Sequence, residues 1–189
     1  MVAAPSSELE HVGVPLPCEA RRARIRDLVA NYHDPVWKFV RHLGASAALA
    51  DEVVQEVFLV AFRRADDLRE GSERAFLFGT AFRTARHALK KHHREPVVED
   101  VDRAADLAPN PEESLDRKQT RELAYRLLGE LDDDLRAPFV MFELEGMSMH
   151  DIGRVMGLPI PTVGSRLRRA REAFRACVQR HKSRLRGPL

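Results

Sequence analysis

The sequence is poor in the features that mark secreted, membrane or disulfide-rich proteins. Its 189 residues include only two cysteines, Cys18 and Cys177, which lie far apart and outside any zinc-like spacing, so no disulfide framework is implied. No apolar run is long enough to span a membrane. The first residues lack the basic start and apolar core of a signal peptide. We therefore expect a cytoplasmic protein.

Patterns typical of catalysis and of cofactor binding are also missing. No nucleophile occurs with a partner base and an orienting acid, and no glycine-rich loop that would bind phosphate is present. His87, His92 and His93 lie close together, and Cys177 and His181 are four residues apart. Histidines in a basic helix contact phosphates or lie at the surface more often than they bind a metal. We therefore expect no metal, no cofactor and no enzymatic activity.

Charge is unevenly distributed, although the net charge is only +2. The segments from Arg83 to Arg94 and from Arg166 to Arg186 are basic, whereas Glu95 to Asp116 is mostly acidic. Such segregation indicates two separate DNA-facing surfaces joined by an acidic connector.

The apolar pattern predicts an all-α protein of two small helical domains joined by a flexible acidic linker. Helical periodicity begins near Arg21, and no alternation of period two is present. Prolines and acids interrupt the periodicity in the middle of the chain. The predicted parts are a flexible tail at 1–20, a first domain at 21–95, a linker at 96–112, a second domain at 113–183 and a tail at 184–189.

The first domain is predicted to hold several amphipathic helices. An early helical pattern is interrupted at Asp34-Pro35 and ends at Gly44. A long helix from about Leu49 to Ala65 follows, and a polar loop separates it from a helix over roughly 74–93. The buried side of the long helix is predicted to comprise Val53, Val54, Val57, Phe58, Ala61 and Phe62.

The segment from Glu145 to Arg171 reads as a helix-turn-helix. Ser148 is placed to cap the first helix, with Asp151 as the return half of a capping box. Gly157 marks the turn, and Pro161 suits the first turn of the second helix. A buried stripe follows at helical spacing, made of Val163, Leu167, Ala170 and Phe174. Upstream, Pro138 falls inside an expected helix and should kink it.

These segments together resemble a known family. The run from Leu49 to Leu59, Leu-Ala-Asp-Glu-Val-Val-Gln-Glu-Val-Phe-Leu, resembles the region 2 signature of the sigma-70 family. With the helix-turn-helix, it is similar to the extracytoplasmic-function (ECF) sigma factors, which keep only regions 2 and 4. The resemblance covers roughly residues 21–181. It implies a factor that binds core RNA polymerase at its clamp and flap, opens promoter DNA, and is held inactive by an anti-sigma factor.

The resemblance also implies roles for individual residues. Asp51, Glu52, Gln55 and Glu56 would dock on the polymerase clamp. The −10 element would contact Arg74, Phe76, Arg83, Arg86, Lys90 and Lys91. The −35 element would contact Thr162, Ser165, Arg166, Arg168, Arg169 and Arg171. Phe78, by contrast, is expected in the core.

Two positions depart from the family pattern. Arg83 stands where many relatives have an asparagine that reads the −10 sequence, and Gly164 replaces a common lysine or arginine. Two alternatives stay open, and the departure at Thr80 to Arg83 keeps the second of them open. One is a helix-turn-helix regulator that acts without polymerase, which leaves the segment from Asp51 to Phe58 unexplained. The other is a sigma-like adaptor that docks on polymerase but does not melt DNA.

Overall fold

The computed structural model describes residues 18–69, 71–92 and 115–186, and within these ranges it contains helices and no strand. An N-terminal group comprises α1 (Cys18–His42), α2 (Ala47–Arg63) and α3 (Glu73–His92). A C-terminal group comprises α4 (Leu115–Gly129), α5 (Asp133–Phe139), the π-helix η2 (Val140–Leu144), α6 (Met149–Met156) and α7 (Ile160–Arg186). The all-α prediction is confirmed. The predicted linker at 96–112 and most of the predicted tails lie outside the described residues.

Helix α1 begins earlier than predicted and continues past the proline that was expected to interrupt it. The helix includes residues 18–20, which the sequence placed in the tail, and it contains Pro35. A proline cannot donate to the carbonyl four residues earlier, which belongs to Asn31. Asn31 is exposed, so water can replace the missing donor. The helix therefore survives, and the predicted break is wrong.

Helix α2 buries most of its predicted side. Ser46 caps it by accepting a hydrogen bond from the Leu49 amide at 3.2 Å. Ala61 is fully buried, but Phe62 is 41% exposed. Successive residues turn by about 100° around a helix, so Phe62 points away from the core that Ala61 faces. The prediction that Phe62 is buried is wrong.

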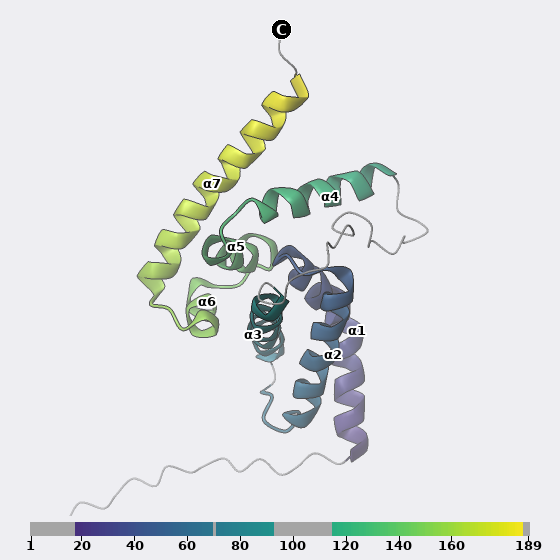
Figure 1. Cartoon of the computed structure of the whole chain (residues 1–189). Helices are drawn as coiled ribbons and strands as arrows, with labels where there is room; N and C mark the ends of the chain where they lie inside the picture. Colours follow the sequence, from purple (N-terminus) through teal and green to yellow (C-terminus); the bar gives the residue numbers. More distant parts are fainter. Residues whose placement is uncertain (1–17, 70, 93–114, 187–189) are drawn as a thin grey trace, which may run out of the picture.

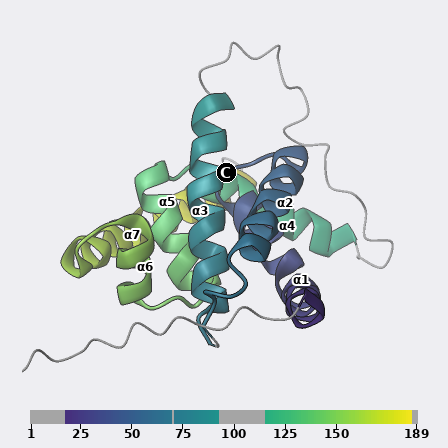
Figure 2. The same ribbon diagram turned by 90° about the horizontal axis from the view of Figure 1, so that it is seen from below.

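The two groups share one hydrophobic core. In the N-terminal group Phe39 meets Phe78 edge to face, with ring centroids 5.1 Å apart, and in the C-terminal group Phe139 packs against Phe174 at 5.0 Å. Helix α3 lies between α2 and α6 (Figures 1 and 2) and contacts both. The buried residues of both groups form one continuous cluster. The two helical groups are thus packed together in this structure.

Arg136 of α5 links the two groups through hydrogen bonds to main-chain carbonyls. Its guanidinium donates to Leu128, Gly129 and Leu131, at and just after the end of α4, at 2.8, 3.0 and 2.7 Å. Its Nη1 also donates to the carbonyl of Leu43, just after α1, at 2.9 Å. Carbonyls at helix ends lack helical partners. One side chain therefore satisfies the ends of helices from both groups.

The turn after α1 is shaped to receive this guanidinium. Gly44 has a φ of 103°, a conformation that glycine adopts without strain. A Cβ at Gly44 would lie 2.7 Å from Nη1 of Arg136, so any other residue would force the guanidinium to shift. The prediction that Gly44 ends the first helical segment is confirmed.

We expect Arg136→Ala to lower the free energy of unfolding by about 3 kcal/mol, because hydrogen bonds from a charged donor to several carbonyls are lost. Urea denaturation followed by circular dichroism measures the change. Arg126→Ala removes an exposed arginine of α4 and should leave the midpoint nearly unchanged. Equal effects of the two substitutions would show that Arg136 does not link the groups.

His42 lies where α1 meets α4. Its ring centroid is 5.1 Å from that of Tyr125, and the Arg41 guanidinium lies over the same Tyr125 ring at 5.1 Å. Burial, together with the positive charges of Lys38 and Arg41, lowers the pKa of His42 from 6.5 to about 4. The imidazole is therefore neutral in the folded protein at physiological pH.

Stability should fall as the pH drops from 6.5 towards 4. The unfolded chain binds a proton at His42 in this window and the folded chain does not, which costs up to about 1.4 kcal/mol per pH unit. Above pH 6.5 the residue contributes no pH dependence. Denaturation at several pH values should show that His42→Asn reduces this slope, whereas His87→Asn at an exposed position of α3 retains it.

Candidate nucleic-acid and protein interfaces

Helix α2 presents a polar face away from the core. Asp51, Glu52, Gln55 and Glu56 are all exposed, as their spacing predicts. The Asp51 carboxylate accepts a hydrogen bond from the Trp37 indole at 2.7 Å, which fixes one edge of the face.

The same face continues into apolar residues that the sequence analysis missed. Leu59 is 50% exposed and Phe62 is 41% exposed. They stand four and seven residues after Gln55, so they lie on the same side of the helix. Their helical spacing from Gln55 is the feature of the sequence that could have identified Leu59 and Phe62 as part of this face.

Helix α3 carries a basic face over its second half. Arg83, Arg86, Lys90 and Lys91 are exposed. Spacings of three and four place Arg83, Arg86 and Lys90 on one side of the helix, and Lys91 lies about 100° further round. The Arg83 guanidinium lies 3.4 Å from the Thr80 hydroxyl. Four of the six residues predicted to contact the −10 element therefore lie together on the surface.

The other two predicted −10 residues are placed differently. Phe76 is half-buried and packs against the core that includes the buried Phe78 and Phe82. Arg74 donates a hydrogen bond to the Glu145 carbonyl, lies 3.4 Å from the Glu145 carboxylate, and stacks over the Phe78 ring at 4.9 Å. Arg74 thus contacts the C-terminal group.

Burial raises the pKa of the Glu145 carboxyl, although the charges of Arg74 and Lys38 oppose that shift. The carboxylate is partly removed from water, and Arg74 compensates part of that cost. The Arg74–Glu145 pair is therefore an integral contact between the two groups.

A glycine inside α3 allows α6 to approach closely. Gly79 is buried, and a Cβ there would lie 3.0 Å from Cγ2 of Val155. Glycine in a helix interior costs about 1 kcal/mol relative to alanine. The contact with Val155 gives a structural reason for that cost.

We expect Gly79→Leu to separate α3 from α6 without reducing helix content, because the larger side chain occupies the space of Val155 while leucine favours the helix. Small-angle scattering should show a larger radius of gyration, and circular dichroism should remain unchanged. Combining it with Val155→Ala should partly restore the smaller radius. His87→Leu, at an exposed position of the same helix, should keep the wild-type radius; if Gly79→Leu keeps it too, the glycine is not needed for the contact.

The helix-turn-helix forms as predicted, with one difference. Ser148 caps α6 by accepting from the Asp151 amide at 3.1 Å. The Asp151 carboxylate accepts from the Ser148 hydroxyl at 2.7 Å, in place of the main-chain amide that a capping box would use. Gly157 ends α6 in the left-handed conformation, with a φ of 68°. Val163, Leu167 and Ala170 are buried and hold α7 against the rest of the domain.

The exposed side of α7 carries the predicted −35 residues. Ser165, Arg168 and Arg169 are exposed, and Thr162 is half-buried. The Ser165 hydroxyl donates to the Thr162 carbonyl at 2.9 Å. Ser165, Arg168 and Arg169 therefore lie on the accessible surface of the second helix, where a helix-turn-helix contacts base edges.

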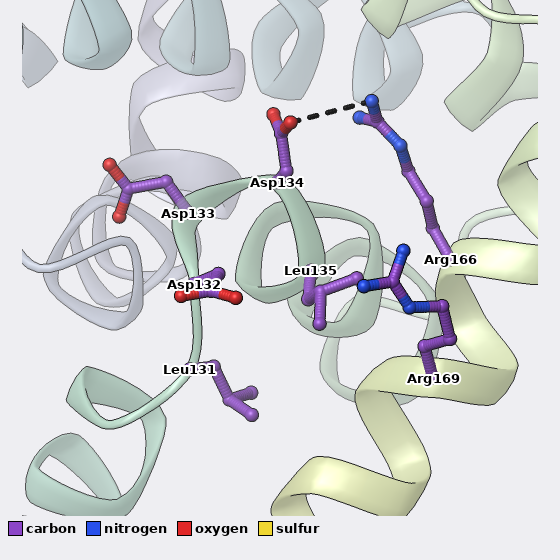
Figure 3. Close-up of a pocket in the computed structure, with 7 residues that line it drawn as sticks. All are labelled: Leu131, Asp132, Asp133, Asp134, Leu135, Arg166 and Arg169. Atoms are coloured by element: carbon purple, nitrogen blue, oxygen red, sulfur yellow. Dashed lines mark hydrogen bonds and ion pairs between the residues drawn. The ribbon is translucent and has the colours of Figure 1, made fainter.

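Two further arginines of α7 are paired with acids of the same domain. Arg166 lies 3.5 Å from Asp134 at the start of α5 (Figure 3), in a depression also lined by Asp132, Asp133 and Arg169. Arg171 donates to Glu143 at 2.6 Å and stacks over Phe142 at 5.3 Å. Neither acid was predicted as a partner from the sequence.

The sequence also raised the possibility of a metal site near Cys177 or the histidines. Cys177 is buried, as predicted for a small core residue, and burial raises the pKa of its thiol. Within residues 18–69, 71–92 and 115–186 no three His, Cys, Asp or Glu side chains are grouped to hold a metal. The His92 side chain and His93 lie outside the described residues.

In the described part of the chain, no helix has the length and apolarity needed to cross a membrane.

Comparison with known families identifies the family to which the chain belongs. The family model for Sigma-70 region 2 matches residues 28–95, and the model for Sigma-70, region 4 matches residues 121–174. The ECF RNA polymerase sigma-E factor of Escherichia coli (strain K12) is 34% identical over 163 residues, which cover 80% of this chain and 85% of that protein. The chain belongs to the ECF sigma factors of the sigma-70 family.

Further relatives agree with this assignment. The RNA polymerase sigma-H factor of Pseudomonas aeruginosa is 31% identical over 163 residues, covering 80% of this ECF sigma factor and 84% of that protein. The fold is shared with RpoE in complex with the anti-sigma factor NepR from Bartonella quintana (TM-score 0.66, 23% identity, 82% and 97% coverage). It is also shared with CnrH in complex with the cytosolic domain of CnrY (TM-score 0.61, 24% identity, 84% and 89% coverage).

Proposed function

We propose that this ECF sigma factor binds core RNA polymerase through α2 and directs it to promoters through α3 and α7. The observation that carries the proposal is that one chain of this family exposes an acidic face on α2 and basic faces on both α3 and α7. Its action is binding and DNA opening, and no chemical step is assigned to it.

The α2 face is suited to a basic partner with an apolar contact beside it. Glu52, Gln55 and Glu56 offer carboxylates and an amide, which pair with a positively charged protein surface. Leu59 and Phe62, next along the helix, supply apolar area of the kind that anchors interface centres. We therefore assign the whole stripe to the polymerase clamp.

The α3 face is suited to the −10 element. Arg86, Lys90 and Lys91 can hold phosphates of the separated strands and the flanking duplex. Arg83, which replaces the family asparagine, can donate two hydrogen bonds to a guanine edge. Arg74 is engaged with Glu145 and Phe76 with the core, so both can join this surface only after leaving those contacts.

The α7 face is suited to the major groove of the −35 element. Ser165, Arg168 and Arg169 are exposed and can meet base edges and nearby phosphates. Arg166 and Arg171 are placed for the DNA backbone, where contacts position the helix. Phosphates would then replace Asp134 and Glu143 as their partners.

The packed arrangement also supports control by a protein partner. RpoE and CnrH, which share this fold, were each solved with a protein partner, NepR and CnrY respectively. We propose that an anti-sigma factor binds this chain as well and keeps its two regions from polymerase and promoter. Such a partner would need only to stabilise contacts between the two helical groups that already exist.

Transcription in vitro tests the function directly. The purified protein is mixed with sigma-free core polymerase and genomic fragments, and the 5′ ends of the RNA are sequenced. Discrete starts that share two upstream elements support the proposal. Binding to core without starts, and without permanganate-reactive thymines, indicates the adaptor. Symmetric footprints without polymerase indicate a conventional regulator.

We expect Gln55→Ala with Glu56→Ala to weaken binding to core polymerase by tenfold or more, or at least about 1.4 kcal/mol, because two groups at the centre of the α2 face are removed. Fluorescence anisotropy of labelled protein measures the affinity. Asp27→Ala with Asn31→Ala is the matched control, since it removes an acid and an amide from the exposed side of α1. If both pairs give wild-type affinity, the docking face is misassigned.

A further inference from the structure

Two large apolar side chains are exposed at the starts of the two helices of the helix-turn-helix. Met149 is the first residue of α6 and is 41% exposed, and Ile160 is the first residue of α7 and is 47% exposed. Single exposed apolar residues are common on protein surfaces. These two, however, belong to one surface beside the arginines of α7.

Gly164 connects the two side chains. A Cβ on Gly164 would lie 3.9 Å from the Met149 sulfur, so Met149 reaches over the second turn of α7. Ile160, Gly164 and Arg168 are spaced four residues apart, so they follow one another along one side of α7. The resulting strip consists of Ile160, Gly164 and the Met149 side chain above Gly164, and Arg168 follows at its end; we call it the apolar strip.

The glycine itself is not required by packing within the protein. A separation of 3.9 Å is an ordinary van der Waals contact, so alanine would fit at this position, and it would favour the helix by about 1 kcal/mol. The absence of a side chain instead keeps the surface of α7 low between Ile160 and Arg168. A low surface at the start of a recognition helix lets another molecule come close to Met149 and Ile160.

The position of the strip identifies what approaches it. The first turns of the second helix are the part of a helix-turn-helix that contacts base edges in the major groove. Ser165, Arg168 and Arg169 border the strip, and their charge complements DNA. The apolar group that bases present in the major groove is the C5-methyl group of thymine.

We propose that Met149 and Ile160 read thymine methyl groups in the −35 element, and that Gly164 lets the DNA come close enough for this contact. This assignment rests on the proposed function. It adds an apolar specificity contact to the polar contacts of Ser165, Arg168 and Arg169.

Replacing thymine by deoxyuridine tests the proposal, because it removes only the methyl group and keeps base pairing. Each thymine of the −35 element found by transcription in vitro is replaced in turn, and holoenzyme affinity is measured by anisotropy on labelled promoter. At one or two positions we expect affinity to fall about fourfold, the factor expected for one buried methyl group. The same replacements should have no effect on holoenzyme carrying Ile160→Ala or Met149→Ala, according to which side chain contacts that base.

Leu144→Ala is the matched control, because Leu144 is 48% exposed on η2 and outside the apolar strip. This variant should retain the full response to deoxyuridine. Thermal unfolding confirms that each variant is folded.

Three results overturn the proposal while leaving the sigma-factor function intact. One is an active promoter whose −35 element contains no thymine, and another is wild-type affinity on every deoxyuridine promoter. The third is an Ile160→Ala holoenzyme that loses the same affinity on thymine and deoxyuridine DNA, which would assign the strip to a polymerase or other protein contact. Absence of any transcription start would instead reject the proposed function itself.

Discussion

The guanidinium of Arg136 is the contact on which the arrangement of this sigma factor depends. It donates to the last carbonyls of α4 and to the carbonyl that follows α1, so one side chain with 12% exposure satisfies helix ends from both groups. The Leu131 amide also donates to the Leu128 carbonyl, but carbonyls at and after a helix end generally lack a helical donor, and leaving them unpaired away from water is costly. The link sets the position of α5, and with it η2 and α6, relative to α1. From there α6 comes to lie against α3.

Packing the two groups together changes the environment of side chains that we assign to DNA. Arg74 is held by Glu145, Arg166 by Asp134, and Arg171 by Glu143. In the promoter complex that we propose, phosphates would take the place of these acids. Exposed ion pairs contribute little to stability, so exchanging Asp134 or Glu143 for phosphate costs little. The Arg74 pair is different, because it joins the two groups and the Glu145 side chain is only 11% exposed, so its exchange removes a contact between them.

The sequence analysis succeeded where the interactions join residues close together in the chain, and it failed where they join residues far apart. The helix-turn-helix was predicted because its cap at Ser148, its turn at Gly157 and its buried stripe are all set by neighbours within a few residues. Phe62 was misplaced because apolar character alone does not separate Ala61, at the centre of the buried side, from a residue about 100° away. The roles of Gly79, Arg74 and Arg136 were not predictable, since each depends on a partner far along the chain. Met149 and Ile160 lie at helix starts, where apolar periodicity carries little information.

The structure gives different reasons for the presence of glycine at Gly79 and at Gly164. Both are glycines inside helices that we assign to promoter recognition, and both weaken their helix by about 1 kcal/mol relative to alanine. At Gly79 the protein itself supplies the reason, because a Cβ would lie 3.0 Å from Val155 of α6. At Gly164 the nearest atom, the Met149 sulfur, is at 3.9 Å and would tolerate a methyl group. A cost that internal packing does not explain points to a constraint from outside the chain, and the exposed side of a recognition helix faces the DNA groove.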